Sequence, residues 1–338
     1  MRITLDEVDA LAVTALTRAG ASAAQAAPVA RSIRAAEAEG TRGIGLGYLP
    51  WYFNHLRVGK IRGDALPVVI PRAAGALLVD AGDGFAHPAY EAGEAALIAA
   101  AQSQGIAILG VANAYACGVL GYFTDRLARA GLIAIATTNA SSTMAPWGGA
   151  TPFFGTNPWS FAAPRLGRDP LVIDSSSSAT AFVNLATAAA EGRAIPPHWA
   201  LDASGRPTTD AVEGLNGSIA PSGGHKGSAL ALMVEVLSAG LTGAQWSYQA
   251  SSLGDDVGGP PRLGQTFIAI APEILAGGFA PRLDGMLAAM VTEEGVRLPG
   301  ARRHDNRLQN MRDGAEIDLD FAAELEALAG RPLIEFVG

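Results

Sequence analysis

The sequence predicts a mixed α/β or α+β fold, with a helical section made from both ends of the chain. Helical patterns fill the first and last parts of the sequence, whereas from about residue 76 short apolar runs alternate with helical ones. The 338 residues are 49% hydrophobic and 17% charged. A chain of this length and composition can bury a large core, so we expect a folded protein and not a disordered one.

Two capping boxes mark the starts of the first two predicted helices. Thr4 is followed three residues later by Glu7, in front of apolar residues at helical spacing. Ser22 and Gln25 repeat this pattern in front of a second helix. A glycine-broken stretch over 40–47 then ends that helix. Local signals therefore predict a pair of helices at the N-terminus.

Strands and helices alternate in the middle of the chain. The apolar runs predicted as strands cover 76–79, 106–111, 132–136, 159–162, 171–173 and 266–270. The predicted helices there and at the C-terminus cover 48–58, 89–101, 122–130, 179–190, 226–241, 281–290 and 318–328. Residues 249–264 are rich in glycine and proline and are predicted to form a long exposed loop.

The charge balance and the cysteine content exclude several classes of protein. Asp plus Glu number 32 against 24 for Lys plus Arg, a net charge of −8, so general nucleic-acid binding is not expected. Cys117 is the single cysteine, which excludes an intrachain disulfide and a thiolate zinc site, and we predict no metal site. The residues after Met1 are unlike a signal peptide, and the most apolar helical segment, 228–244, carries Glu235. We expect a cytoplasmic protein that binds a small-molecule substrate and no membrane.

Lys226 is one of only two lysines, and it lies between glycines at the predicted start of a long apolar helix. A helix N-terminus offers free amide donors and positive potential, so an added ammonium group is suited to an anion site. A solvated surface lysine explains the pattern equally well from composition alone. The glycine-rich stretch 43–48 lacks the third glycine of a dinucleotide-binding fingerprint, so no standard Rossmann loop is predicted there.

Motifs that lie in order over nearly the whole chain carry a family resemblance. They are Ala-Pro-Trp-Gly-Gly at 145–149, Phe-Gly-Thr-Asn-Pro at 154–158, the stretch 196–210, Gly-Gly-His-Lys-Gly at 223–227, Leu-Thr-Gly-Ala at 241–244 and Leu-Pro-Gly at 298–300. Together they resemble the malate/L-lactate dehydrogenase-like family, which uses NAD(P) without a standard Rossmann domain. That family includes ureidoglycolate dehydrogenase, diketogulonate reductase and the piperideine- and pyrroline-2-carboxylate reductases.

The resemblance implies a fold, an assembly and a set of cofactor-binding residues. The fold is a helical domain over 1–75 and 295–338 and an α/β domain over 76–294 with a mostly antiparallel, non-Rossmann sheet; the assembly is a homodimer. The residues implied to bind NADP or NAD are Ser175, Ser176, Ser177, Ser178, His225, Lys226, Gly300 and Arg302. Hydroxyl, ammonium and guanidinium groups are suited to ribose and phosphate oxygens. The choice between NAD and NADP stays open, with Arg302 or Arg303 as a partner for a 2′-phosphate.

Several functional positions depart from the family pattern. Ile44 stands where the family carries its proton-donating histidine, and Tyr48 stands where it carries an arginine that helps to hold the substrate carboxylate. Ala116 replaces a second family histidine, and Phe-Val-Asn at 182–184 replaces an Arg-Gly-Lys. Because isoleucine and alanine cannot exchange protons, the usual mechanism for a ketone lacks its acid.

These losses favour a C=N substrate over an ordinary ketone. Hydride addition to a ketone develops a negative charge that must be neutralised, whereas addition to an iminium carbon cancels an existing positive charge. Asp174, which aligns with the family's acidic partner of the histidine, and Tyr48 are the candidate catalytic residues. The alternative role for Asp174 is a cap on the turn after its strand, and the alternative for Tyr48 is core packing.

The predicted function is an NAD(P)H-dependent oxidoreductase that reduces the C=N bond of a cyclic imine or iminium, or an unusual C=O compound. One alternative is a family scaffold repurposed for a non-redox reaction such as a cyclisation or isomerisation. Another is a binding protein without catalysis. Loss of both histidines favours these alternatives, whereas the serine run and the pair His225-Lys226 favour a cofactor-dependent enzyme.

Overall fold

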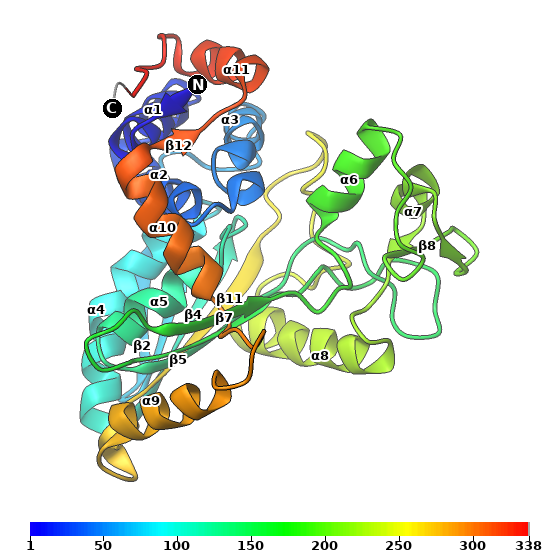
Figure 1. Cartoon of the computed structure of the whole chain (residues 1–338). Coiled ribbons are helices and arrows are strands. Elements are labelled where there is room, and N and C mark those ends of the chain that lie inside the picture. Colours follow the sequence, from blue (N-terminus) through cyan, green and yellow to red (C-terminus); the bar gives the residue numbers. More distant parts are fainter. Residues whose placement is uncertain (337–338) are drawn as a thin grey trace.

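A seven-stranded mixed sheet forms the centre of the computed structural model, which describes residues 1–336 (Figure 1). Its strands are β2 (Val68–Ala73), β3 (Ala76–Asp80), β4 (Ile106–Ala114), β5 (Ile133–Thr138), β6 (Trp159–Ala163), β7 (Leu171–Ser175) and β11 (Leu263–Ile270). Their spatial order is β2-β3-β4-β11-β5-β6-β7, and every neighbouring pair is antiparallel except β3 and β4. The expected mostly antiparallel sheet is therefore confirmed.

Strand β2 is an element that the sequence pattern did not reveal. It lies before residue 76, where the α/β domain was expected to begin, and it forms a hairpin with β3 in which Val69 pairs with Val79. Most of its residues are exposed, so it lacks the apolar run by which the other strands were predicted. Pro71 is tolerated there because β2 is an edge strand.

Helices surround the sheet. They are α1 (Leu5–Arg18), α2 (Ala23–Ala38), α3 (Leu49–Arg57), α4 (Ala86–Gln104), α5 (Gly121–Arg129), α6 (Phe182–Ala190), α7 (Ala211–Asn216), α8 (His225–Glu235), α9 (Phe279–Met290), α10 (Ala301–Asp313) and α11 (Leu319–Ala329). Figure 1 shows α6 and α7 in a separate lobe beside the sheet, where they accompany the short strands β8 (Ala200–Leu201), β9 (Pro207–Thr208) and β10 (Ser218–Ile219).

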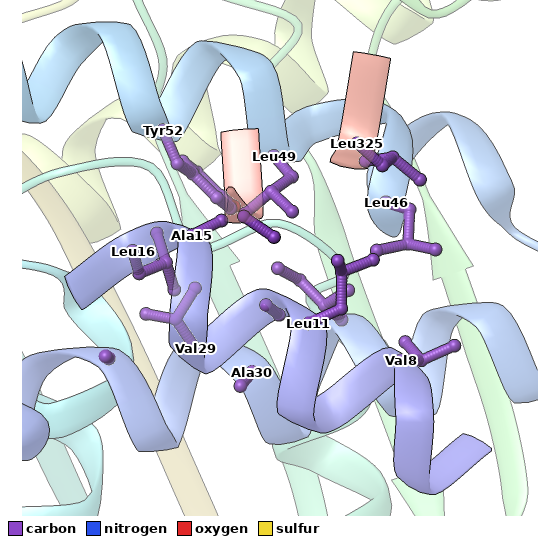
Figure 2. Packing of buried hydrophobic residues seen from close by; sticks show 14 of the residues in the cluster. Val8, Leu11, Ala15, Leu16, Val29, Ala30, Leu46, Leu49, Tyr52 and Leu325 are labelled. Atoms are coloured by element: carbon purple, nitrogen blue, oxygen red, sulfur yellow. The ribbon is translucent and has the colours of Figure 1, made fainter. Parts of the chain in front are cut away.

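The two chain ends meet in one helical section, as the sequence predicted. Strand β1 (Arg2–Ile3) pairs with β12 (Ala315–Glu316), and α1 packs against α2, α3 and α11. Figure 2 shows side chains from these helices pointing toward one another, among them Val8, Leu11 and Leu325, each of which is fully buried. This core holds the segment that leads into α3 in a fixed position.

The predicted helix caps are present, but neither capping box is completed, since the side chain of Gln25 bonds to the backbone of Ala65 and Phe85 instead. The hydroxyl of Thr4 accepts a hydrogen bond from the Glu7 amide at 3.0 Å, and Ser22 does the same for Gln25 at 3.3 Å. The Glu7 carboxylate does not complete its box, because it is buried against the C-terminal segment and pairs with Arg331 at 2.5 Å. The first helix is thus joined directly to the chain end.

The helix predicted over 226–241 is interrupted. Helix α8 ends at Glu235 and continues as a π-helical turn, Val236–Gly240. The buried Glu235 carboxylate accepts hydrogen bonds from Asn157 at 2.7 Å and from the amide of Ser247 at 2.6 Å. The acidic residue of this apolar segment is therefore satisfied internally.

No helix in residues 1–336 is both long and apolar enough to cross a membrane.

Candidate active site

A cavity of about 510 Å³ opens where the helical section, the end of β7 and the α6–α7 lobe meet. Its wall comes from segments that are distant in sequence: residues 41–51, the loops after β4 and β5, the end of β7, and the starts of α6 and α10. The exposed loop predicted over 249–264 contributes residues 252–254. The cavity therefore forms only when the chain ends and the sheet are assembled together.

The positions that depart from the family pattern converge on this cavity. Ile44, Tyr48, Ala116, Phe182 and Val183 all line it. Ile44 lies in a 3₁₀ turn, Arg42–Ile44, that precedes α3, and Ala116 lies in the loop after β4. The substitutions therefore all change the cavity lining, and Ile44, Ala116, Phe182 and Val183 make it more apolar.

Asp174 lies at the carboxyl end of β7 and borders the cavity. Its Oδ2 accepts a hydrogen bond of 2.8 Å from the amide of Gly121, the first residue of α5. Burial raises the pKa of Asp174, and the nearby guanidinium of Arg303 and the Gly121 amide oppose that rise. Asp174 thus caps α5, not the turn after its own strand, and it also faces the cavity. The catalytic role of Asp174 stays a prediction.

Tyr48 precedes α3, and its ring packs edge-on against Tyr52 with the ring centroids 5.3 Å apart. Its side chain is half-buried and lines the cavity. Burial raises the pKa of Tyr48, with a smaller effect from Cys117, so the phenol stays protonated near neutral pH. No hydrogen bond joins the Tyr48 hydroxyl to another residue within the described chain. The phenol is therefore free to donate to a molecule in the cavity.

The serine run after β7 divides into two parts. Ser175 and Ser176 line the cavity. Ser177 is fully buried and donates to the carbonyl of Asn157 at 2.7 Å, and Ser178 donates to the carbonyl of Thr180 at 2.7 Å. Ser176 also donates to the carbonyl of Ser178 at 3.0 Å, so three of the four hydroxyls hold the loop in place and Ser175 is the exposed one.

The start of α8 contacts this serine run. The amide of Ser222 donates to the carbonyl of Ser177 at 2.9 Å, and Pro221 bridges to Ser178. A Cβ on Gly227 would lie 2.2 Å from the carbonyl oxygen of Ser222, so only glycine allows this close approach. His225 and Lys226 are therefore carried beside the serines, although neither lines the cavity itself.

The start of α10 lies against the same strand. Gly300 precedes the helix with φ +79°, and a Cβ there would lie 2.9 Å from the carbonyl oxygen of Val172 in β7. Arg302 is exposed and lies outside the cavity, whereas Arg303 lines it. The three segments implied to bind the cofactor are thus gathered along β7 and its end. Their hydroxyls, cations and free helix N-termini fit the oxygens of a dinucleotide.

Sequence reasoning missed some of the cavity wall. Trp51 lies three residues after Tyr48, a spacing that puts both on one face of α3 and was available as a signal. No sequence pattern indicated that residues 252–254 line the cavity, because hydrogen bonds from a buried lysine hold this loop in position. Lys60 is fully buried, and its Nζ donates to the carbonyls of Ser252 at 2.5 Å and Asp255 at 2.7 Å.

Comparison with known proteins identifies the family of this chain. The profile of the malate/L-lactate dehydrogenase family matches residues 3–326. The chain belongs to this family. A (2R)-3-sulfolactate dehydrogenase (NADP(+)) of Chromohalobacter salexigens is 42% identical over 97% of this chain and 98% of its own length. A Delta(1)-pyrroline-2-carboxylate reductase of Ancylobacter novellus is 38% identical over 98% of each chain.

Solved structures of the malate/L-lactate dehydrogenase family share the fold. The crystal structure of delta1-piperideine-2-carboxylate reductase from Pseudomonas syringae pvar. tomato has a TM-score of 0.92 and 35% identity, and it covers 97% of this chain and 99% of its own. The predicted family, fold class and class of NAD(P)-dependent oxidoreductase are confirmed. Within residues 1–336, no group of three or more His, Cys, Asp or Glu side chains could hold a metal ion.

Proposed function

We propose that this protein is an NAD(P)H-dependent reductase of the C=N bond in a small cyclic imine, or of an unusual C=O compound. The observation that carries the proposal is the cavity in which Ile44 and Ala116 replace the histidines of the family while Asp174 remains at its edge. Relatives that reduce pyrroline- or piperideine-2-carboxylate, at 36–38% identity, support the C=N substrate.

The chemistry of a C=N bond is suited to these residues. When bound, the nicotinamide supplies a hydride, which adds to carbon while the π electron pair moves to nitrogen. A protonated iminium carries a positive charge that this step cancels, so the cavity does not have to stabilise an oxyanion. Asp174 would hold a proton near the imine nitrogen as the acid or stabilise the iminium charge as the carboxylate, and the burial that raises the pKa of Asp174 favours the first of these roles. The Tyr48 hydroxyl would donate a hydrogen bond that orients the substrate.

The cofactor would lie along the end of β7. Ser175 and Ser176 would contact it from the cavity side, and His225 and Lys226 would present the positive N-terminus of α8 to its phosphates. Gly300, which has no side chain, would let the cofactor lie beside Arg302. Ser177 and Ser178 would act by fixing the loop. Arg302 or Arg303 is the candidate partner of a 2′-phosphate.

A titration tests the proposal. The purified protein is titrated with NADPH and with NADH by fluorescence, and turnover is then followed with pyrroline-2-carboxylate, piperideine-2-carboxylate and pyruvate. We expect saturable binding with a Kd near the micromolar range, about −8 kcal/mol, and faster turnover of the cyclic imines than of pyruvate. Binding of neither nucleotide would overturn the proposal and favour a non-redox or purely binding role. Faster turnover of pyruvate would favour a ketone substrate.

We further propose that the protein is a cytoplasmic homodimer. The side chains of Leu232, Met233, Val236 and Leu241 on α8 and the turn after it are 48–57% exposed, a surface that a second copy could cover. Light scattering of the purified protein tests this, and a monomeric mass at micromolar concentration would contradict it.

A further inference from the structure

Arg303 is a cation that borders the cavity and forms a long ion pair with Asp174. It lies in the first turn of α10, and its side chain is 27% exposed. Its Nη1 is 3.7 Å from Oδ2 of Asp174, which is beyond hydrogen-bond distance. No hydrogen bond joins its guanidinium to any residue in the described part of the chain. A guanidinium has five N–H donors, so its capacity to bind an anion is unused here.

A second arginine on the same face of α10 has closer partners than Arg303. Arg307, one helical turn further on, pairs with Glu39 and lies 3.6 Å from Asp169. It therefore ties α10 to the helical section and to the segment before β7. Arg303 reaches Asp174 of β7 at a similar distance of 3.7 Å, but it makes no hydrogen bond to a described residue, so its donors stay available to a ligand.

The charge balance of the cavity gives Arg303 a specific role. Among the described residues that line the cavity, Arg303 is the single cation and Asp174 the single acidic group. Burial raises the pKa of Asp174, and the nearby Arg303 opposes that rise. A partly buried guanidinium without hydrogen-bond partners is costly, so this site is suited to an anionic ligand.

The apolar wall of the cavity limits what else the ligand can carry. Ile44, Trp51, Phe182, Val183 and Leu215 line the cavity with apolar side chains. A ligand that fits both walls has one anionic end and an apolar body. Tyr48 cannot supply the missing cation, because a neutral phenol offers one hydrogen bond and no charge.

We propose that Arg303 is the specificity-determining residue that binds the carboxylate of the substrate. The apolar ring of the substrate lies against the wall formed by Ile44 and Phe182, and its reacting carbon lies near Asp174. This inference rests on the proposed function, and it adds that the substrate is a cyclic imine carrying a carboxylate. The carboxylate is thus held from α10 and not from the start of α3.

The experiment compares a charged and an uncharged substrate. Arg303→Met, Arg303→Lys and wild type are assayed with pyrroline-2-carboxylate and with uncharged 2-methylpyrroline, and the Kd for NADPH is measured by fluorescence. Arg312→Met is the matched control, because Arg312 is exposed on the same helix and lies outside the cavity. We expect R303M to lower kcat/KM for the carboxylate about 10- to 100-fold, since a charged hydrogen bond is lost. The uncharged imine and the Kd for NADPH should change less than about twofold.

Three results would overturn the inference. An equal loss on both imines would mean that Arg303 has no role in recognising the carboxylate. A weaker Kd for NADPH would assign the guanidinium to the phosphates of the cofactor. If wild type binds NADPH and reduces neither imine, the proposed function itself fails, and the inference fails with it. Should R303M not fold, R303K decides, because it keeps the charge but loses the planar pair of donors. A loss of about threefold or more confined to the carboxylate then supports the inference.

Discussion

The two walls of the cavity differ in how they are built and in what they can do. The polar wall, with Asp174, Ser175 and Arg303, is carried by the end of a central-sheet strand and by the first turn of a helix. The apolar wall, with Ile44, Ala116 and Phe182, is carried by a 3₁₀ turn, a loop and the first turn of α6. Loops and turns tolerate substitution at small cost to the fold, whereas strand ends are fixed by the sheet. The comparison teaches that the reaction of this scaffold can change on one wall while the binding of its ligands stays on the other.

Asp174→Asn should have the largest effect, because it removes the one acid of the polar wall. The amide keeps the size of the side chain and can still accept from the Gly121 amide, so the fold should persist. We expect kcat for a cyclic imine to fall about 100-fold or more. Because burial raises the pKa of Asp174, wild-type activity should fall as pH rises through that pKa, and the variant should lose this dependence. An unchanged rate and pH profile would leave Asp174 as a cap on α5 alone.

Ile44→His tests whether the apolar wall alone prevents reduction of ketones. A histidine there would restore a proton donor in the cavity, and we expect the rate with pyruvate to rise about tenfold or more. Ile44→Leu is the control, since it keeps the wall apolar and adds no proton donor. If the rate with pyruvate stays the same in both variants, the substrate preference comes from elsewhere in the cavity.

Lys226→Ala tests the proposed cofactor-binding residues that lie outside the cavity, at the start of α8. Removal of an ammonium group beside the N-terminus of α8 should raise the Kd for NADPH about tenfold, because a charged contact to phosphate is lost. Fluorescence titration measures this directly. Arg72→Ala is a matched loss of charge on exposed strand β2, at the other edge of the sheet, and should leave the Kd unchanged. Equal effects of the two variants would remove Lys226 from the cofactor site.

Tyr48→Phe should have the smallest effect, and it separates the role of the Tyr48 hydroxyl from that of its ring. The variant removes one hydroxyl and leaves the edge-on contact with Tyr52. We expect kcat/KM for the imine to fall about 3- to 10-fold, the value of one neutral hydrogen bond. The melting temperature should not change, because the hydroxyl bonds to no other described residue. A lower melting temperature with unchanged kinetics would make Tyr48 a packing residue.

The fold could be predicted from the sequence to the extent that its signals are local. The caps at Thr4 and Ser22 and the apolar strands β4 and β11 follow from residue types at short spacing. Strand β2 could not be predicted, because an exposed edge strand has no apolar run and exists only through its pairing with β3. The end of α8 at Glu235 was hidden for a similar reason, since distant partners at Asn157 and Ser247 satisfy the carboxylate.

The sequence by itself determined the family, the residue types at each functional position and the loss of the two histidines. Only the tertiary structure decided that Ile44, Ala116, Asp174 and Arg303 border one cavity. It also decided that Ser177 is buried in the loop while Ser175 lines the cavity. The physical reason is that capping and periodicity act over a few residues. The meeting of the chain ends with the sheet instead depends on packing between segments far apart in the sequence, which short-range patterns do not encode.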